Sequence, residues 1–114
     1  MLKHSVVLVP FPFNDLSSSK VRPAVCLTHA IGPHNHVVLA FITSRIPTAL
    51  LATDVAIDAA ATDFATTGLR VSSTLQLHRL MTITTTLIRR TLGTLPPQLQ
   101  KEVEDRLRRL FELA

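Results

Sequence analysis

The sequence predicts a small, mainly β domain that ends in one α-helix. Short apolar runs rich in β-branched residues recur along most of the chain, and clusters of Pro, Gly, Asn and Ser separate them. The last segment instead places apolar residues at helical spacing. Many short strands with one amphipathic helix are typical of a small β-barrel, or of a strongly bent sheet, that the helix caps. With 114 residues, 46% of them hydrophobic, we expect a single domain over residues 1–114.

The first two strands are predicted on either side of a polar loop. Residues 5–11 are apolar and β-branched, as in a buried strand, and Pro10 and Pro12 end the run or push it to a sheet edge. Residues 14–20 are polar and rich in turn formers, so they are predicted to form a loop. Residues 23–28 are the second predicted strand.

The middle of the chain continues the strand pattern. A turn signal at 31–35 precedes a long apolar run, and Val55 and Ile57 alternate with polar or small neighbours as in a strand. The Ala-rich stretch 58–64 could form a helical turn. The strands predicted after the second are 36–44, 53–57, 69–77, 78–83 and 88–93, with a turn at 84–87 before the last.

The C-terminal helix has the clearest signals. Pro96 and Pro97 stand where proline is tolerated at a helix start. An apolar stripe at helical spacing is accompanied by i,i+4 charge pairs in the favourable acid-first order, each worth about 0.3 kcal/mol. The stripe comprises Leu99, Val103, Leu107, Leu110 and Phe111, and the pairs are Glu102–Arg106, Glu104–Arg108 and Asp105–Arg109.

The charge of the chain is unevenly distributed. The net charge is +4, and the charges of residues 96–114 cancel, so the whole excess lies in residues 1–95. A basic body suits a polyanionic partner. The apolar runs are far shorter than the ~20 residues that a membrane span needs, and residues 1–5 lack the pattern of a signal peptide, so we expect a cytoplasmic protein. The single Cys26 cannot form an internal disulfide and is expected to be a buried small residue.

The most informative segment is the polar loop and the residues that follow it. A polar loop between two buried strands is a common place for functional residues. Arg22 ends this loop and carries a planar fork of donors suited to phosphate. Thr43 and Ser44 end the third predicted strand and could add hydroxyls, so together these residues suggest a phosphodiester substrate. The alternatives are an ion pair between Arg22 and Asp15, and local backbone bonds for the two hydroxyls.

The segments VLVPFPFNDLSSSKVRPAVCL, AFITSR and TLGTLPPQLQKEV resemble the MazF/PemK toxins of bacterial toxin–antitoxin pairs, which are sequence-specific endoribonucleases. The resemblance implies a small SH3-like barrel that forms a homodimer, with single-stranded RNA along the dimer groove and an acidic antitoxin as partner. It implies no metal or nucleotide cofactor. It places Arg22 and Thr43 at the catalytic positions of the family, with Ser44 completing the common Thr-Ser form.

His78 stands where many relatives have an acidic residue, and it could act as a proton donor or acceptor near neutral pH. The alternative is a half-exposed strand histidine without a catalytic role. Lys20 and Arg79 are predicted to contact phosphates, and the loop residues could read unpaired bases. The predicted RNA-binding residues are Asn14, Asp15, Ser17, Ser18, Ser19, Lys20 and Arg79.

The sequence departs from the family pattern at the start of the first strand, where His4 and Ser5 replace Gly-Asp, and at Thr84, where Asp is frequent. His34 and His36 are too few for a metal site, which needs three or four ligands. A second functional class remains open: a CcdB-like inhibitor of DNA gyrase, which acts through the last residues of its C-terminal helix. An apolar, packed ending at 110–114 is expected to favour the nuclease.

Overall fold

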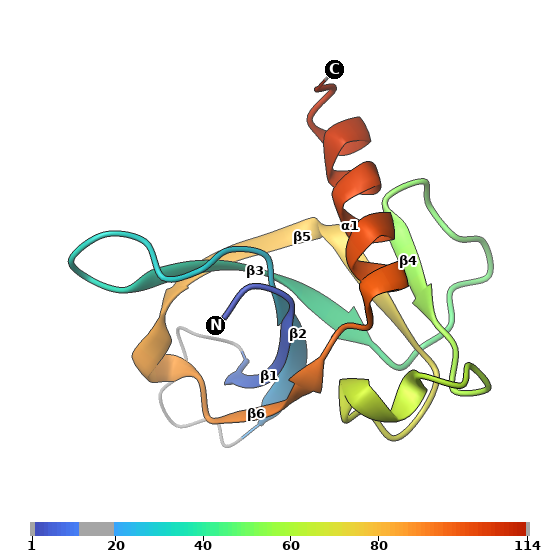
Figure 1. The fold of residues 1–114 in the computed structure, drawn as a ribbon, viewed down its shortest axis with the longest axis horizontal. Coiled ribbons are helices and arrows are strands. Elements are labelled where there is room, and N and C mark those ends of the chain that lie inside the picture. Colours follow the sequence, from blue (N-terminus) through green and yellow to red (C-terminus); the bar gives the residue numbers. More distant parts are fainter. Residues whose placement is uncertain (1, 12–19, 114) are drawn as a thin grey trace.

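Six antiparallel strands form one curled sheet in the order β4-β5-β3-β2-β1-β6, and one helix lies at its end (Figure 1). The computed structural model describes residues 2–11 and 20–113. The mainly β fold with a C-terminal helix is therefore confirmed. The strands are β1 (Ser5–Pro10), β2 (Val21–Cys26), β3 (His36–Thr43), β4 (Asp54–Ile57), β5 (Ser73–Thr84) and β6 (Arg90–Thr94). The helices are α1 (Pro97–Leu110) and the 3-10 turns η1 (Phe64–Thr67) and η2 (Thr85–Leu87).

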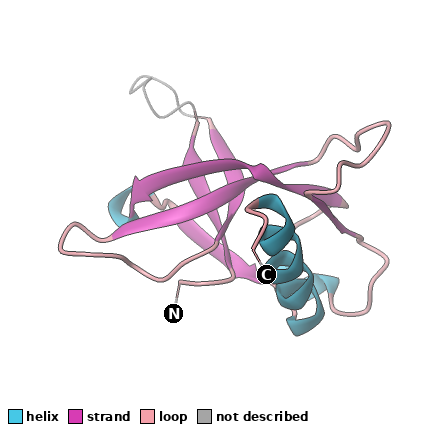
Figure 2. Cartoon of the chain, turned by 90° about the horizontal axis from the view of Figure 1, so that it is seen from above, coloured by secondary structure: helices cyan, strands magenta, loops and turns pink. Residues whose placement is uncertain are grey.

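The central strands are apolar on both faces because the sheet curls around one core and carries a second core behind it. Successive residues of a strand point to opposite faces. Val6 accordingly belongs to one buried cluster and Val7 to the other. The first cluster includes Val103 of α1, so the helix covers that side of the sheet (Figure 2). This double burial accounts for the nearly continuous apolar runs in β1, β2 and β3.

One predicted boundary between strands is wrong. Residues 69–77 and 78–83 were expected to form two strands, whereas β5 is a single strand from Ser73 to Thr84. The pairing of β3 with β5 jumps from Ala40↔Leu80 to Phe41↔Gln76, which leaves three residues of β5 without a partner on β3. Such a bulge bends a strand without a turn, so the polar Gln-Leu-His-Arg run marks a bend and not an end. The Leu77 N–H donates instead to the Thr53 carbonyl, at 3.2 Å.

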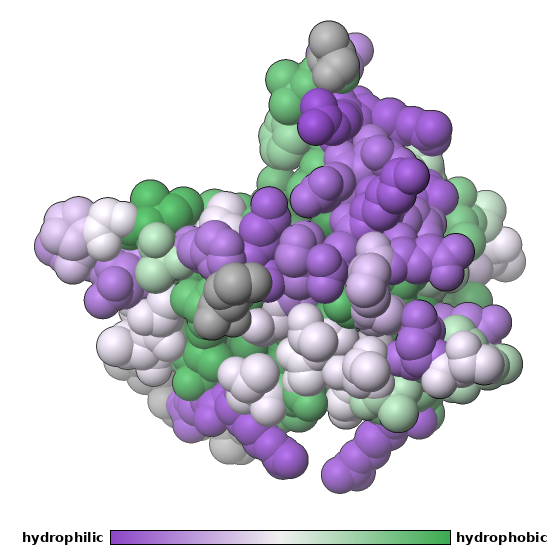
Figure 3. Space-filling model, in the orientation of Figure 1, coloured by the Kyte–Doolittle hydropathy of each residue, from purple (hydrophilic) through white to green (hydrophobic). Residues whose placement is uncertain are grey.

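The helix begins as predicted, with Pro96 as its N-cap and Pro97 as its first residue. Val103 is fully buried, but the expectation of a packed apolar ending is wrong. Phe111 is 56% exposed and Leu113 is 63% exposed, because α1 extends beyond the sheet against which its first turns pack (Figure 1). Hydrophobic side chains flank the C-terminal end of the helix in Figure 3, beside its hydrophilic face.

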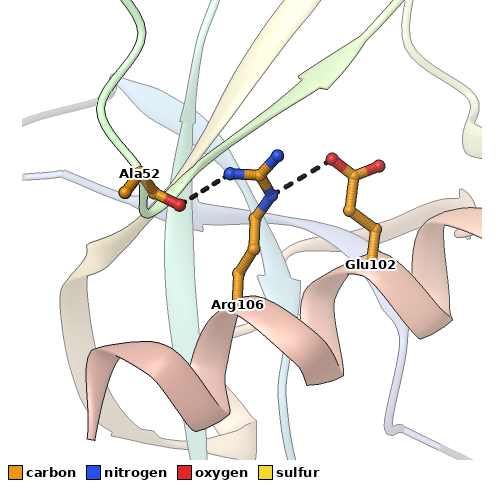
Figure 4. Close-up of polar contacts among 3 residues, drawn as sticks. All are labelled: Ala52, Glu102 and Arg106. Carbon is orange, nitrogen blue, oxygen red and sulfur yellow. Dashed lines mark hydrogen bonds and ion pairs between the residues drawn. The ribbon is translucent and has the colours of Figure 1, made fainter. Parts of the chain in front are cut away.

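Arg106 ties the connection between β3 and β4 to the helix (Figure 4). Its Nη1 donates to the Ala52 carbonyl at 2.6 Å, and its Nε donates to Glu102 at 3.1 Å. The predicted Glu102–Arg106 pair is thus confirmed, and it orients the arginine toward the backbone of the connection. Asp54 completes this anchor by accepting the N–H of Leu51 at 2.9 Å.

Cys26 is fully buried, as predicted, and burial raises the pKa of its thiol to about 11. The thiol therefore stays protonated at neutral pH, where a reactive cysteine would need to be a thiolate. No helix in the described part of the chain is both long and apolar enough to cross a membrane.

Candidate functional site

A cleft of about 670 Å³ opens where the ends of several strands converge, and we refer to it as the arginine cleft. It receives side chains from β1, β2, β3, β5 and β6, from the segment after η1 and from the residues that follow β3. Its walls are formed by Leu8, Phe11, Arg22, Pro23, Phe41, Ile42, Thr43, Ser44, Arg45, Gly68, Leu69, Arg70, Val71, Ser73, Arg79, Arg90 and Leu92.

Five arginines from five separate segments line this cleft. They are Arg22, Arg45, Arg70, Arg79 and Arg90. Among the residues that the structure describes, no Asp or Glu lines it. A concave site with charges of one sign concentrates the potential and attracts the opposite charge. Guanidinium groups bind phosphate through paired N–H donors. The cleft is therefore suited to a chain of phosphodiester groups.

The rest of the cleft lining is mainly apolar. Phe11 and Phe41 pack edge to face, with ring centroids 5.3 Å apart and an interplanar angle of 70°. Leu8, Pro23 and Ile42 also contribute apolar surface to the lining. An aromatic and aliphatic surface next to cations is the combination with which proteins bind single-stranded nucleic acid, because bases cover the apolar part and phosphates the charged part.

Arg22 and Thr43 both line this cleft, from β2 and from the end of β3. The last pair between β2 and β3 is Ala24↔Phe41, and continuing the antiparallel register by two residues sets Arg22 across from Thr43. Both residues line the cleft. Thr43 Oγ1 accepts the N–H of Arg45 at 3.1 Å. A local backbone bond was the alternative role named above for this hydroxyl. Because the oxygen accepts in this bond, the hydroxyl hydrogen can still be donated to a ligand.

The structure brings together some of the predicted site residues and separates others. Four of them line the cleft, namely Arg22, Thr43, Ser44 and Arg79. His78 is exposed but does not line it, although its neighbour Arg79 does. Lys20 is exposed at the entry to β2, also outside the cleft lining, and its carbonyl accepts the Phe11 N–H at 3.2 Å. The remaining predicted residues, Asn14, Asp15, Ser17, Ser18 and Ser19, lie outside the described residues.

Sequence reasoning missed Arg45, Arg70 and Arg90. They lie in three different segments, and although Arg45 ends the AFITSR run and Arg90 follows Arg89, nothing local in the chain places the three arginines in one site. The available signal was the positive excess confined to residues 1–95, which includes all five cleft arginines. That excess predicts a negatively charged partner, but it does not show which Lys and Arg side chains lie in the same site.

Two glycines hold one wall of the cleft in place. Gly68 has a φ of 72° and packs against the backbone of Leu92, and Gly93 packs against the backbone of Thr66 and Thr67. A Cβ at either glycine would collide with backbone atoms of the facing segment. This close approach sets the segment that carries Leu69 and Arg70 against β6. It thereby positions two of the cleft walls relative to each other.

The departure from the family pattern at His4 has a structural counterpart. His4 adopts a φ of 74°, a backbone conformation that glycine adopts without strain. Its Nδ1 is buried without a hydrogen-bond partner. Burial, followed by the charge of Lys3, lowers the pKa of His4. His4 lies at the end of the sheet away from the cleft, where its carbonyl accepts the N–H of Leu95 at 2.9 Å.

The described residues contain no group of three or more His, Cys, Asp or Glu side chains placed to hold a metal ion. His34 and His36 come together as expected for neighbours across a turn, with ring centroids 5.9 Å apart.

Comparison with known proteins identifies the relatives of this fold. A family model described as PemK-like, MazF-like toxin of type II toxin-antitoxin system matches residues 3–111. A search of curated proteins found no match. Among solved structures, the Mycobacterium tuberculosis toxin MazF-mt6 is similar with a TM-score of 0.72 and 24% identity, over 96% of this chain and 98% of that chain.

Two further structures are endoribonucleases from Mycobacterial species. One, in complex with its cognate antitoxin, has a TM-score of 0.72 and 16% identity, over 100% of this chain and 97% of that chain. The other has a TM-score of 0.69 and 14% identity, over 99% of this chain and 92% of that chain. At these identities the likeness establishes the fold.

Proposed function

Because the chain belongs to the PemK-like, MazF-like toxins of type II toxin–antitoxin systems, we propose that it is an endoribonuclease that cuts single-stranded RNA at a short sequence. The observation that carries this proposal is the cleft that five arginines line together with two phenylalanines, with no acidic side chain among its described residues. Two structurally similar proteins are endoribonucleases, which supports the same assignment.

The proposed reaction is an attack of the ribose 2′-OH on the adjacent phosphorus, with cleavage of the bond to the 5′-oxygen. It yields a 2′,3′-cyclic phosphate, or after hydrolysis a 3′-phosphate, and a 5′-OH. Arg22 would stabilise the extra negative charge on the phosphorane, because the hydrogen bonds from its preorganised, paired N–H donors become stronger as that charge develops. Thr43 would donate its hydroxyl hydrogen to a phosphate oxygen, and exposed Ser44 would add a second hydroxyl. This mechanism uses no metal ion.

Proton transfer is assigned to His78 in this proposal. The exposed imidazole is next to Arg79 on the bend of β5 but outside the cleft lining. It can therefore act only if the RNA backbone passes over that bend on its way into the cleft. This requirement makes His78 testable separately from Arg22: His78→Asn should reduce the rate of cleavage without weakening RNA binding.

The proposal includes two protein partners. A homodimer would extend the cleft of one protomer into a longer groove for RNA, and a cognate acidic antitoxin would cover the arginines. One structurally similar endoribonuclease is in complex with its cognate antitoxin, which supports this kind of partner. A disordered acidic segment can wrap a large basic surface and exclude RNA. Because its substrate would be messenger RNA, we place the protein in the cytoplasm.

A second candidate function is supported by the end of α1. Phe111 and Leu113 are exposed, so the helix terminus is available for a protein partner. A CcdB-like toxin would use this terminus to inhibit DNA gyrase by binding, without cutting RNA. The arginine cleft has no part in that mechanism.

One experiment separates the two functions. Purified protein is incubated with a long RNA in EDTA and the new ends are mapped, while a parallel reaction measures DNA supercoiling by gyrase. The proposal predicts defined cuts with 5′-OH ends and unchanged supercoiling. Intact RNA together with inhibited gyrase would establish the second function. Phe111→Ser would abolish that inhibition but leave RNA cleavage intact.

A further inference from the structure

Arg79 lies where the cationic and apolar sides of the arginine cleft meet. Its guanidinium carbon is 5.8 Å from the centroid of the Phe41 ring, within the range of a cation–π contact. Its Nη1 also donates to Gln76 Oε1 at 3.4 Å. These two contacts, one with the Phe41 ring and one with the Gln76 side chain, restrict how the guanidinium group can turn.

The backbone also fixes the position of Arg79. It belongs to the three residues of β5 that have no partner on β3, at the bulge that bends the strand. Phe41, the first residue of β3 beyond this bulge, is buried and paired with Gln76. Arg79 therefore extends from a bend in a paired strand onto a buried aromatic ring, a more rigid arrangement than a side chain on a loop.

This position suits a nucleobase better than a phosphate. The phosphates of a bound strand would find Arg22, Arg45, Arg70 and Arg90 elsewhere on the cleft walls. A phosphate gains nothing from the apolar lining around the partly exposed Phe11, whereas a base gains by removing its faces from water there. A guanidinium plane is itself a platform on which a base can stack.

We propose that Arg79 is a specificity-determining residue that reads a guanine in the single-stranded RNA. The inference rests on the proposed function for the presence of RNA in the cleft. Guanine presents two neighbouring acceptors, O6 and N7, that match two parallel N–H donors of arginine. On the corresponding edge adenine presents a donor beside N7, cytosine a single donor and uracil a single acceptor, so none of them offers the fork two acceptors there. Of the five N–H donors of arginine, the bond to Gln76 uses one.

The test measures base preference in binding, without relying on cleavage. A pool of short, randomised RNAs with 2′-O-methyl ribose cannot be cut through the 2′-oxygen. The bound and input fractions are sequenced for the wild type, for Arg79→Ala and for Arg79→Lys. Arg109→Ala is the matched control, because Arg109 is an exposed arginine on α1 outside the cleft lining.

The wild type and Arg109→Ala should enrich guanine at one position of the bound sequences. A good bidentate contact discriminates by about 5- to 150-fold, and both Arg79 variants should lose that factor at this position alone. Arg79→Lys keeps the charge and should keep the overall affinity while it loses the preference. Substituting 7-deazaguanine at the selected position should weaken binding to the wild type but not to Arg79→Ala.

Several results would overturn the inference. A guanine preference that survives in Arg79→Ala, a uniform loss of affinity across all sequences, or a wild type that binds the pool with no guanine preference would each exclude base reading by Arg79. The uniform loss would identify Arg79 as a phosphate contact. Cleavage of RNA without a guanine preference would contradict this inference but would agree with the proposed function. Guanine-specific binding without cleavage would support the role of Arg79 and contradict the proposed nuclease function.

Discussion

The guanidinium of Arg79 lies over the ring of Phe41, with 5.8 Å between the guanidinium carbon and the ring centroid. Phe41 in turn packs edge to face against Phe11. The two contacts connect a cleft arginine to both phenylalanines of the lining. Its consequence is that an exposed arginine carries an orientation set by a buried aromatic residue.

This relationship predicts that Phe41→Leu will act on specificity through Arg79. Leucine keeps the site apolar, so we expect a loss of stability of about 1 kcal/mol, measured by urea unfolding. Without the aromatic face the guanidinium is less restricted, and base preference should weaken at the same position as in Arg79→Ala. The double variant should show no further loss. Additive losses in the two single variants would mean that Phe41 and Arg79 act independently.

The cleft arginines should determine how RNA binding depends on salt. Neutralising a phosphate of a single strand releases a counterion and contributes about 0.7 to the slope of log affinity against log salt concentration. Replacing Arg45, Arg70 or Arg90 by alanine should therefore lower that slope by about 0.7 each, as measured by fluorescence titration. Arg109→Ala serves again as the control. Unchanged slopes in all three variants would show that the cleft does not hold the RNA backbone.

The two close-packed glycines predict a large difference between substitutions with the same backbone angle. Gly68 and Gly32 both have a φ of 72°, but a Cβ at Gly68 would meet the backbone of Leu92, whereas at Gly32 it would meet nothing within 4 Å. Gly32→Ala should cost about 1 kcal/mol from the left-handed conformation alone. Gly68→Ala should cost a further 1–3 kcal/mol or so because the crowded segments must separate. Equal losses of stability for the two variants in thermal unfolding would show that η1 and β6 can separate at no energetic cost.

His4 should make the free energy of unfolding depend on pH. Its pKa is lowered in the folded protein by burial, then by Lys3, with a smaller opposing effect of Glu104 and a further lowering by His29. The folded state thus binds fewer protons than the unfolded state, and stability is lost as pH falls below about 6.5 toward the lowered pKa. His4→Asn, which also tolerates a positive φ, should lose less stability between pH 7.5 and pH 5. An identical pH dependence in the two proteins would remove His4 from this role.

Much of the fold could be read from the sequence, because its signals are local. The apolar runs of β1, β2 and β3 and the proline-capped start of α1 each depend on a few consecutive residues. The continuity of β5 could not be predicted, because a bulge and a turn both interrupt an apolar pattern with polar residues. The exposed end of α1 was missed for a related reason: helical periodicity continues past the point where the sheet stops covering the helix.

Only some of the site residues were predicted, and there is a physical reason why the others were not. Arg22 and Thr43 belong to motifs within single segments, and both line the arginine cleft. Arg45, Arg70 and Arg90 converge only when the sheet curls, so no spacing in the sequence marks them. His78 and Arg79 are neighbours in sequence, yet only Arg79 lines the cleft, a separation that depends on the local shape of the bulge.

The proposed function depends most on Arg22, which is proposed to stabilise the phosphorane during metal-independent RNA cleavage in the arginine cleft. The direct measurement is the initial rate of cleavage of a long RNA in EDTA by the wild type, Arg22→Ala, Arg22→Lys and the control Arg109→Ala, all checked for folding. The account predicts full activity in EDTA for the wild type and the control, a loss of about 10²–10³-fold for Arg22→Ala, and incomplete rescue by lysine. Cleavage that stops in EDTA and returns with Mg²⁺, or a fully active Arg22→Ala, would contradict it.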